Sequence, residues 1–171
     1  MRRAGSQRLR RHVAKHPADE APALRDTGRV MSEESTTPDL ALLTQRLTVA
    51  IGDPRDTEPE MSLFAPNAVW DMSQGGAEVI EGHEAILAFF EQWLGAYAEY
   101  GQEVEEIQDL GNGVAFAVFL QRGRPVGSTG WVEFRDARVL LFADGLIERV
   151  NAFVDINEGR AAAERLAEER G

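Results

Sequence analysis

An aspartate and an arginine stand two residues apart in a β-rich stretch, at Asp136 and Arg138. Because side chains alternate along a strand, both should face the same side of a sheet. The arginine could hold an enolate or a carboxylate through its fixed donors. An ion pair between the two residues is an equally simple explanation of the spacing, so both interpretations stay open.

A second acidic residue, Asp71, lies between two apolar residues in a short predicted strand, 69–72. Alternate side chains of a strand face opposite sides, so Trp70 and Met72 should line a pocket while Asp71 points away, unless a bulge intervenes. A turn or salt-bridge role for Asp71 is therefore favoured over catalysis.

Other polar residues give weaker signals. Arg122 ends an apolar strand and could reach over a pocket mouth, although solvated loop arginines are commoner. His83 stands at the start of a predicted helix, where exposure and local capping explain it better than acid–base work. The sequence has no cysteine and shows no metal-ligand cluster, phosphate-binding glycine loop or serine-nucleophile elbow. We expect neither a metal nor another cofactor.

The elements that must position these residues change in kind along the chain. Apolar residues first recur at helical spacing, which predicts helices over 37–51, 56–65 and 83–94. After residue 100 the pattern favours strands near 101–110, 113–122, 129–142 and 145–156. Asn112-Gly113 and Asp144-Gly145 are typical hairpin turns between them. A surface helix is expected over 158–171.

The second of these strands is apolar on both faces, because every residue from Val114 to Leu120 is apolar. Such a strand is normally covered on both sides. The helices should cover one side, and a partner subunit is the simplest cover for the other. We therefore expect a homodimer.

Charge divides the chain unevenly. Residues 1–30 carry eight Lys/Arg against three Asp/Glu, a net charge of +5, and the rest of the chain carries −16. So acidic a body repels phosphate groups, and we expect neither nucleic acid nor a membrane as a partner. Residues 1–36 are predicted to be a disordered basic tail. Alternatively they include an overextended start, since the sequence from Met31 is typical of a natural chain start.

Length and composition indicate one domain, predicted over 37–157. No apolar run approaches the roughly 20 residues that cross a bilayer, and the absence of cysteine suits a reducing compartment. We expect a cytoplasmic protein.

Three segments carry a family resemblance, which covers about residues 39–157. They are Leu63-Phe64-Ala65-Pro66-Asn67-Ala68-Val69-Trp70-Asp71, Ile80-Glu81-Gly82-His83-Glu84-Ala85-Ile86 before an aromatic helix, and Asp144-Gly145-Leu146-Ile147-Glu148-Arg149. The chain resembles the nuclear transport factor 2-like superfamily, and its SnoaL-like, polyketide cyclase-like branch most. The resemblance implies an α+β cone, in which three N-terminal helices pack on a curved antiparallel sheet around an apolar pocket, and a homodimer.

The resemblance also bears on the candidate residues. The general base of ketosteroid-isomerase-like members would fall at Met72, with Asp71 beside it, and their second acid would fall near Arg138, which cannot act as a neutral acid. SnoaL-like cyclases use an aspartate in this sheet, and Asp136 or Asp155 could serve.

Two functions remain open on this basis. One is a cofactor-independent isomerase, cyclase, dehydratase or hydrolase acting on a small apolar carbonyl compound, with Asp71, Asp136 and Arg138 as catalytic candidates. The other is a noncatalytic ligand-binding or dimerisation module. A buried carboxylate directed into the cavity would favour the enzyme. The ligand should direct a carbonyl, enol or carboxylate toward an arginine, Arg138 first. The predicted pocket residues are Trp70, Met72, Phe90, Trp93, Phe116, Val118, Arg122, Trp131 and Leu140.

Overall fold

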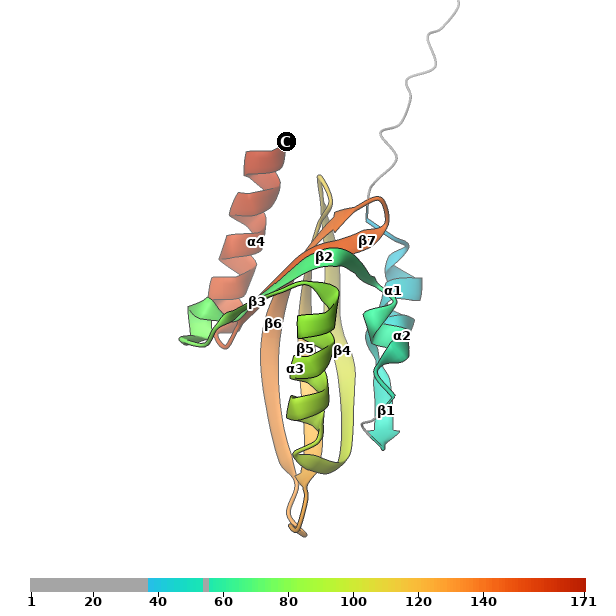
Figure 1. Ribbon diagram of the computed structural model, residues 1–171. Coiled ribbons are helices and arrows are strands. Elements are labelled where there is room, and N and C mark those ends of the chain that lie inside the picture. Colours follow the sequence, from blue (N-terminus) through green and yellow to red (C-terminus); the bar gives the residue numbers. More distant parts are fainter. Residues whose placement is uncertain (1–36, 54–55) are drawn as a thin grey trace, which may run out of the picture. The chain divides into compact units, whose positions relative to one another are not determined.

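The computed structural model describes residues 37–53 and 56–171, so the predictions made for residues 1–36 lie outside the described part (Figure 1). The elements in chain order are α1 (Leu40–Leu47), β1 (Val49–Gly52), α2 (Glu58–Met61), β2 (Phe64–Asp71), a 3-10 turn η1 (Ser73–Gly75), β3 (Val79–Glu81), α3 (His83–Leu94), β4 (Tyr97–Gly111), β5 (Val114–Pro125), β6 (Val132–Ala143), β7 (Leu146–Phe153) and α4 (Ile156–Arg170). None of the described helices is long and apolar enough to cross a membrane.

The strands form one seven-stranded sheet in the order β1-β4-β5-β6-β7-β2-β3. All neighbours are antiparallel except β2 and β7, which run parallel. The β4–β5 and β6–β7 hairpins turn at Asn112-Gly113 and Asp144-Gly145, where all four residues have positive φ. This backbone geometry is that of a type I′ turn, which Asn-Gly and Asp-Gly favour. The predicted α+β class and the predicted hairpins are confirmed.

The N-terminal elements differ from the prediction at their ends. Helix α1 begins after Asp39, whose side chain accepts a hydrogen bond from the Leu42 amide at 2.9 Å, and it ends at Leu47. The next residues form β1 and pair with β4, so Ile51 belongs to a strand and not to the predicted helix. Thr48 and Val49 are β-branched, which favours the change to an extended chain.

Strand β2 is also longer than predicted, because it starts at Phe64 and not at residue 69. Its pairing with β7 shifts register between Phe64 and Val69. Pro66, which lacks an amide donor, lies within this irregular part, where a proline disturbs the ladder least.

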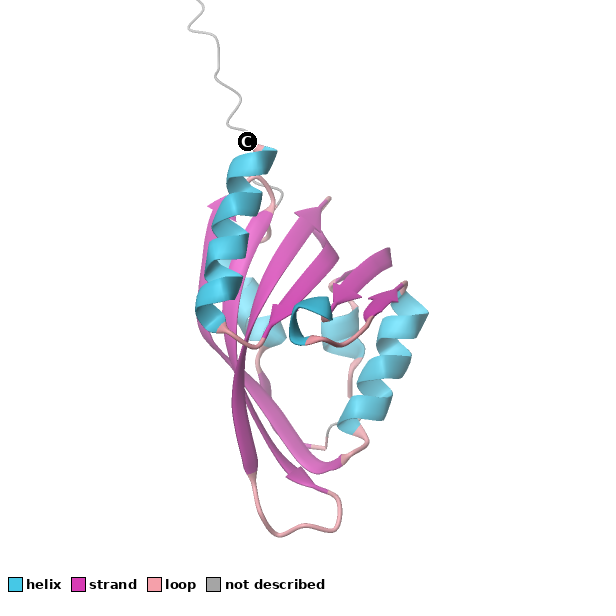
Figure 2. Cartoon of the chain, turned by 90° about the vertical axis from the view of Figure 1, so that its left-hand side faces the viewer, coloured by secondary structure: helices cyan, strands magenta, loops and turns pink. Residues whose placement is uncertain are grey.

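The sheet carries a core on each face. On one face, α1, α2 and α3 pack over the strands, with Leu43, Met61 and Ile86 buried against residues such as Phe119 and Leu140. On the other face, α4 lies along the sheet, opposite the remaining helices (Figure 2). Its small residues Gly159, Ala163 and Ala167 are buried there.

Helix α4 covers the outer face that the sequence assigned to a partner subunit. Val114, Phe116 and Val118 are buried in one cluster with Ala163 and Ala167 of α4. The apolar run of β5 is therefore covered on both faces within the chain. The run gives no argument for a subunit interface.

Candidate functional site

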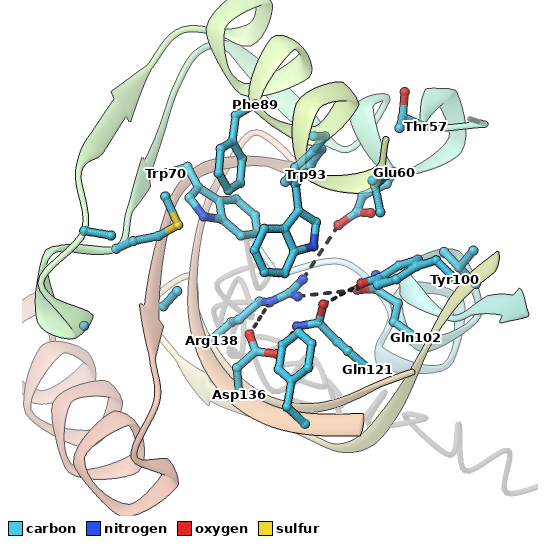
Figure 3. Close-up of a pocket in the computed structure, with 18 of the residues that line it drawn as sticks. Thr57, Glu60, Trp70, Phe89, Trp93, Tyr100, Gln102, Gln121, Asp136 and Arg138 are labelled. Carbon is cyan, nitrogen blue, oxygen red and sulfur yellow. Dashed lines mark hydrogen bonds and ion pairs between the residues drawn. The ribbon is translucent and has the colours of Figure 1, made fainter. Parts of the chain in front are cut away.

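A cavity of about 270 Å³ lies between α2, α3 and the inner face of the sheet (Figure 3). Its polar end is lined by Glu60 of α2, Tyr100 and Gln102 of β4, Gln121 of β5, and Asp136 and Arg138 of β6. The remaining wall is mainly apolar and includes Trp70, Met72, Ala77, Phe89, Phe90, Trp93, Phe134, Ala152 and Phe153. One concave site thus combines a large apolar surface with a compact group of polar side chains.

Arg138 is the centre of the polar end. Its Nε donates a hydrogen bond to Asp136 Oδ2 at 2.8 Å, and its Nη1 lies 3.7 Å from Glu60 Oε1. Its Nη2 donates to Gln102 Oε1 at 3.4 Å. The guanidinium carbon lies 3.9 Å from the ring centre of Phe119 and 5.1 Å from that of Trp70. Every nitrogen of the guanidinium therefore has a protein partner, and aromatic rings lie against it.

The charges of this cluster are buried. The side chain of Arg138 is 6% exposed, and those of Asp136 and Glu60 are each 16% exposed. Burial raises the pKa of Glu60 above its ordinary value, and the opposing effect of Arg138 is smaller. Burial lowers the pKa of Arg138, but Asp136 and Glu60 together outweigh it and hold that pKa above its ordinary value. Arg138 therefore stays charged, while Glu60 is the carboxyl group inclined to keep a proton.

Hydrogen bonds from buried, uncharged side chains hold the charged cluster in position. Gln121 Nε2 donates to Asp136 Oδ1, and the Tyr100 hydroxyl donates to Gln121 Oε1 at 2.5 Å. Gln102 Nε2 donates to the Leu47 carbonyl at 2.8 Å, at the end of α1. Burial raises the pKa of Tyr100, so its hydroxyl keeps its proton and remains a donor. Such connected polar groups hold one another in a single arrangement.

Asp71 lies away from this cluster and does not line the cavity. Its Oδ1 accepts hydrogen bonds from the amide of Ser73 at 2.9 Å and from its hydroxyl at 2.6 Å, and Oδ2 pairs with Arg149. The Ser73 hydroxyl lowers the pKa of Asp71, and Arg149 adds to this effect. Trp70 and Met72 on either side do line the cavity, as strand alternation predicted. The structure thus brings Asp136 and Arg138 together and leaves Asp71 in a salt bridge.

The predicted pocket residues divide into two groups. Trp70, Met72, Phe90 and Trp93 line the cavity. Phe116 and Val118 do not, which corrects the prediction: strand alternation turns them to the outer face under α4, while Phe119 faces inward.

Three further predicted residues also lie outside the cavity lining. Leu140 faces inward but is buried in the core. Arg122 pairs with Glu133 at 2.7 Å on an exposed part of the sheet, and Trp131 is 50% exposed just before β6. For Leu140 and Arg122 the cause is that the sequence does not reveal how far the cavity extends along each strand.

The two remaining chemical candidates have local structural roles. Asp155 caps α4 by accepting hydrogen bonds from the amides of Asn157 and Glu158. His83 Nε2 lies 3.2 Å from the Met61 carbonyl oxygen at the start of α3. In the described part of the chain, no group of three or more His, Asp or Glu residues could hold a metal ion.

Sequence reasoning missed four members of the cluster, Glu60, Tyr100, Gln102 and Gln121. Gln121 had a signal, because it is a polar residue directly after the apolar run of β5 and faces inward with Phe119. No signal in the sequence pointed to Glu60, since this residue follows Pro59 in a short acidic helix whose pattern is typical of an exposed element.

Comparisons with known proteins identify the family and support the fold. Residues 46–150, more than half of the chain, match the family model described as a SnoaL-like domain. No curated protein matches the chain.

Several solved structures share the fold at low sequence identity. A protein from Catenulispora acidiphila with a ketosteroid isomerase-like fold, solved with trimethylamine, is 12% identical over 74% of this chain and 93% of its own, with a TM-score of 0.56. TerC, co-crystallised with polyporic acid, is 17% identical over 75% and 96%, with a TM-score of 0.54. A SnoaL-like polyketide cyclase from Jannaschia is 18% identical over 63% and 77%, with a TM-score of 0.50.

These structures support the nuclear transport factor 2-like, ketosteroid isomerase-like fold and leave the chemistry to the site itself. Because the family model covers more than half of the chain, the chain belongs to the SnoaL-like domain family.

Proposed function

We propose that this chain is a cofactor-independent enzyme that moves protons on a small, largely apolar carbonyl compound. The observation that carries the proposal is the pair of inward carboxyl groups, Glu60 and Asp136, on either side of Arg138 at one end of an apolar cavity. A buried carboxylate directed into the cavity is the feature expected of the enzyme and not of a simple binder.

The two carboxyl groups suit different roles. Asp136 has the shorter contact with Arg138, at 2.8 Å, and it lines the cavity, so it is our candidate for the base. Glu60 is raised in pKa by burial, so it is our candidate for the acid. In the proposed step Asp136 takes a proton from the carbon beside the carbonyl, and Glu60 gives its proton to the carbonyl oxygen. The products are an enol, a protonated Asp136 and an ionised Glu60.

Protonated Asp136 can then give its proton to a different carbon of a conjugated enol while Glu60 takes back the hydroxyl proton, which yields an isomer. Alternatively the enol carbon attacks a second carbonyl carbon and closes a ring, with Glu60 taking back the hydroxyl proton and Asp136 giving its proton to the oxygen of the attacked carbonyl. Arg138 stabilises the negative charge as it moves from Asp136 to Glu60, since it contacts both. The choice between these outcomes depends on the ligand.

The alternative is a noncatalytic binding module. The observation in its favour is that both oxygens of Asp136 already accept hydrogen bonds, from Arg138 and Gln121. In this case the cluster would serve only to fix the fold. Each carboxylate oxygen can accept more than one hydrogen bond, so this observation weakens the catalytic proposal without removing the base.

Deuterium exchange tests the proposal without knowledge of the natural substrate. The probe is β-tetralone, a small apolar ketone, in deuterated water, and proton NMR follows the loss of its α-proton signals. We expect the wild type to exceed the buffer rate and Asp136→Asn to lose about 100-fold or more, the usual contribution of a general base. Asp71→Asn is the matched control and should keep the wild-type rate.

Two results would reject the enzyme. One is a folded wild type that exchanges the ketone no faster than buffer of the same pH. The other is an Asp136→Asn variant that exchanges it as fast as the wild type. In both cases the binding module would be the better description.

A further inference from the structure

The cavity has more acidic groups than basic ones. Glu60, Asp136 and Asp56 line it, and Arg138 is the one cation among its described lining residues. The part of the chain after residue 30 is itself strongly acidic. A carboxylate ligand would therefore enter a site where its charge meets at least two like charges for one opposite charge.

Each nitrogen of this single cation already contacts a protein side chain. Arg138 uses Nε for Asp136, Nη2 for Gln102 and Nη1 for its contact with Glu60. An arginine that binds a carboxylate normally presents two parallel N–H groups to it. Here a carboxylate that took two such groups would compete with Asp136, Gln102 or Glu60 for the same nitrogens.

The same end can still serve an uncharged ligand. When Glu60 holds a proton it can donate a hydrogen bond, and the Arg138 and Asp136 charges cancel. The rest of the cavity receives an apolar body, because Trp70, Met72 and Phe89 line it.

We infer that the pocket selects an uncharged ligand that places one hydrogen-bond-accepting oxygen at the Glu60–Arg138 end, and that it rejects carboxylates. The inference rests on the proposed site. It narrows the expected ligand from a carbonyl, enol or carboxylate to the carbonyl or the enol. Charge selection is a property of binding, so it can hold even if the exchange reaction above fails.

Three naphthalene probes of the same size and different charge test the inference. They are β-acetonaphthone, which is neutral, β-naphthoate, which is an anion, and β-naphthylmethylammonium, which is a cation. Titration calorimetry at neutral pH should show that the full chain binds the ketone at least about tenfold more tightly than either ion. Ala152→Phe, which fills the cavity beside Arg138, should weaken the ketone, and Ala161→Phe on the exposed side of α4 should not.

A more decisive binding experiment removes the protein's own carboxyl groups from the cavity. The Glu60→Gln, Asp136→Asn double variant leaves Arg138 without an ionised partner, so its affinity for β-naphthoate should rise at least about tenfold. If the double variant does not fold, Asp136→Asn alone, which removes the carboxylate that accepts the Arg138 Nε hydrogen bond, should show a smaller rise in the same direction. The inference is overturned if the wild type binds either ion as tightly as the ketone, if it binds no ketone at millimolar concentration, or if the folded variants gain no affinity for the anion.

Discussion

Arg138 donates its Nε–H to Asp136, two residues earlier on β6, at 2.8 Å, and the same guanidinium lies 3.7 Å from Glu60 on α2. Spacing in the sequence left open whether Arg138 forms an ion pair or faces a ligand. The structure shows the ion pair, and both of its residues line the cavity. The energetics of the site therefore depend on three charges considered together.

Loss of the cation should destabilise the whole domain. Arg138→Met leaves Asp136 and Glu60 buried without an opposite charge, and we expect the free energy of unfolding to fall by about 3–5 kcal/mol, as for other broken buried pairs. Urea denaturation followed by tryptophan fluorescence measures this change. The variant is thus predicted to affect stability as well as ligand binding.

A triple variant provides the control for that prediction. Arg138→Met combined with Glu60→Gln and Asp136→Asn removes the charges together, so it should recover much of the lost stability. A triple variant that is no more stable than Arg138→Met alone would show that packing of the arginine, and not charge, causes the loss.

Glu60 should make the folded protein less stable as the pH rises. Its pKa in the folded chain lies above the ordinary value of 4.5, so the folded state holds this proton to a higher pH than the unfolded state does. As pH rises between the two pKa values, the wild type should lose about 1.4 kcal/mol of unfolding free energy per pH unit relative to Glu60→Gln, which has no such proton. Parallel stability–pH curves for the two proteins would contradict the assignment.

The strands and turns that the sequence predicted are those with local signals. Asn112-Gly113 and Asp144-Gly145 require only the positive φ that these residues tolerate, and α3 shows a clear apolar stripe. Strands β1 and β3 are short, and β1 pairs with residues far along the chain, so no local pattern indicated them. Their position depends on tertiary pairing.

Helix α4 is a second element whose packing the sequence pattern did not predict. Its buried residues Gly159, Ala163 and Ala167 are small, so the helix has no strong apolar stripe and reads as a surface element. Small residues instead allow a close approach to the sheet, and this contact covers the outer face of β5 within the chain. Glu60 also had no local signal, since only the tertiary fold brings it within 3.7 Å of Arg138.

Asp71 should matter for stability and not for the pocket. Asp71→Asn removes the charge that binds Arg149 and Ser73, and we expect a loss of about 1–2 kcal/mol because Arg149 is partly exposed. The lowered pKa of Asp71 gives the sign with pH: its contribution is present above the ordinary aspartate pKa and is lost as pH falls through the lower folded value. Thermal unfolding of both proteins at neutral and acidic pH measures the difference, and an equal difference at both would be evidence against the salt bridge.

At Gly159, helix α4 packs closely against the sheet. A Cβ atom there would lie 2.9 Å from Ala137 Cβ and 3.2 Å from Phe153 Cβ, and both of these atoms are fixed to strand backbone. Gly159→Leu should therefore push α4 from the outer face and lower the free energy of unfolding by about 1–3 kcal/mol, although leucine is the better helix former. Ala161→Leu is the control, because that residue lies exposed on the same helix and its substitution should change stability little.

The displaced helix would uncover Phe116 and Val118, so sedimentation of Gly159→Leu should show more self-association than the control. A Gly159→Leu protein as stable and as dispersed as Ala161→Leu would mean that α4 does not hold the outer face.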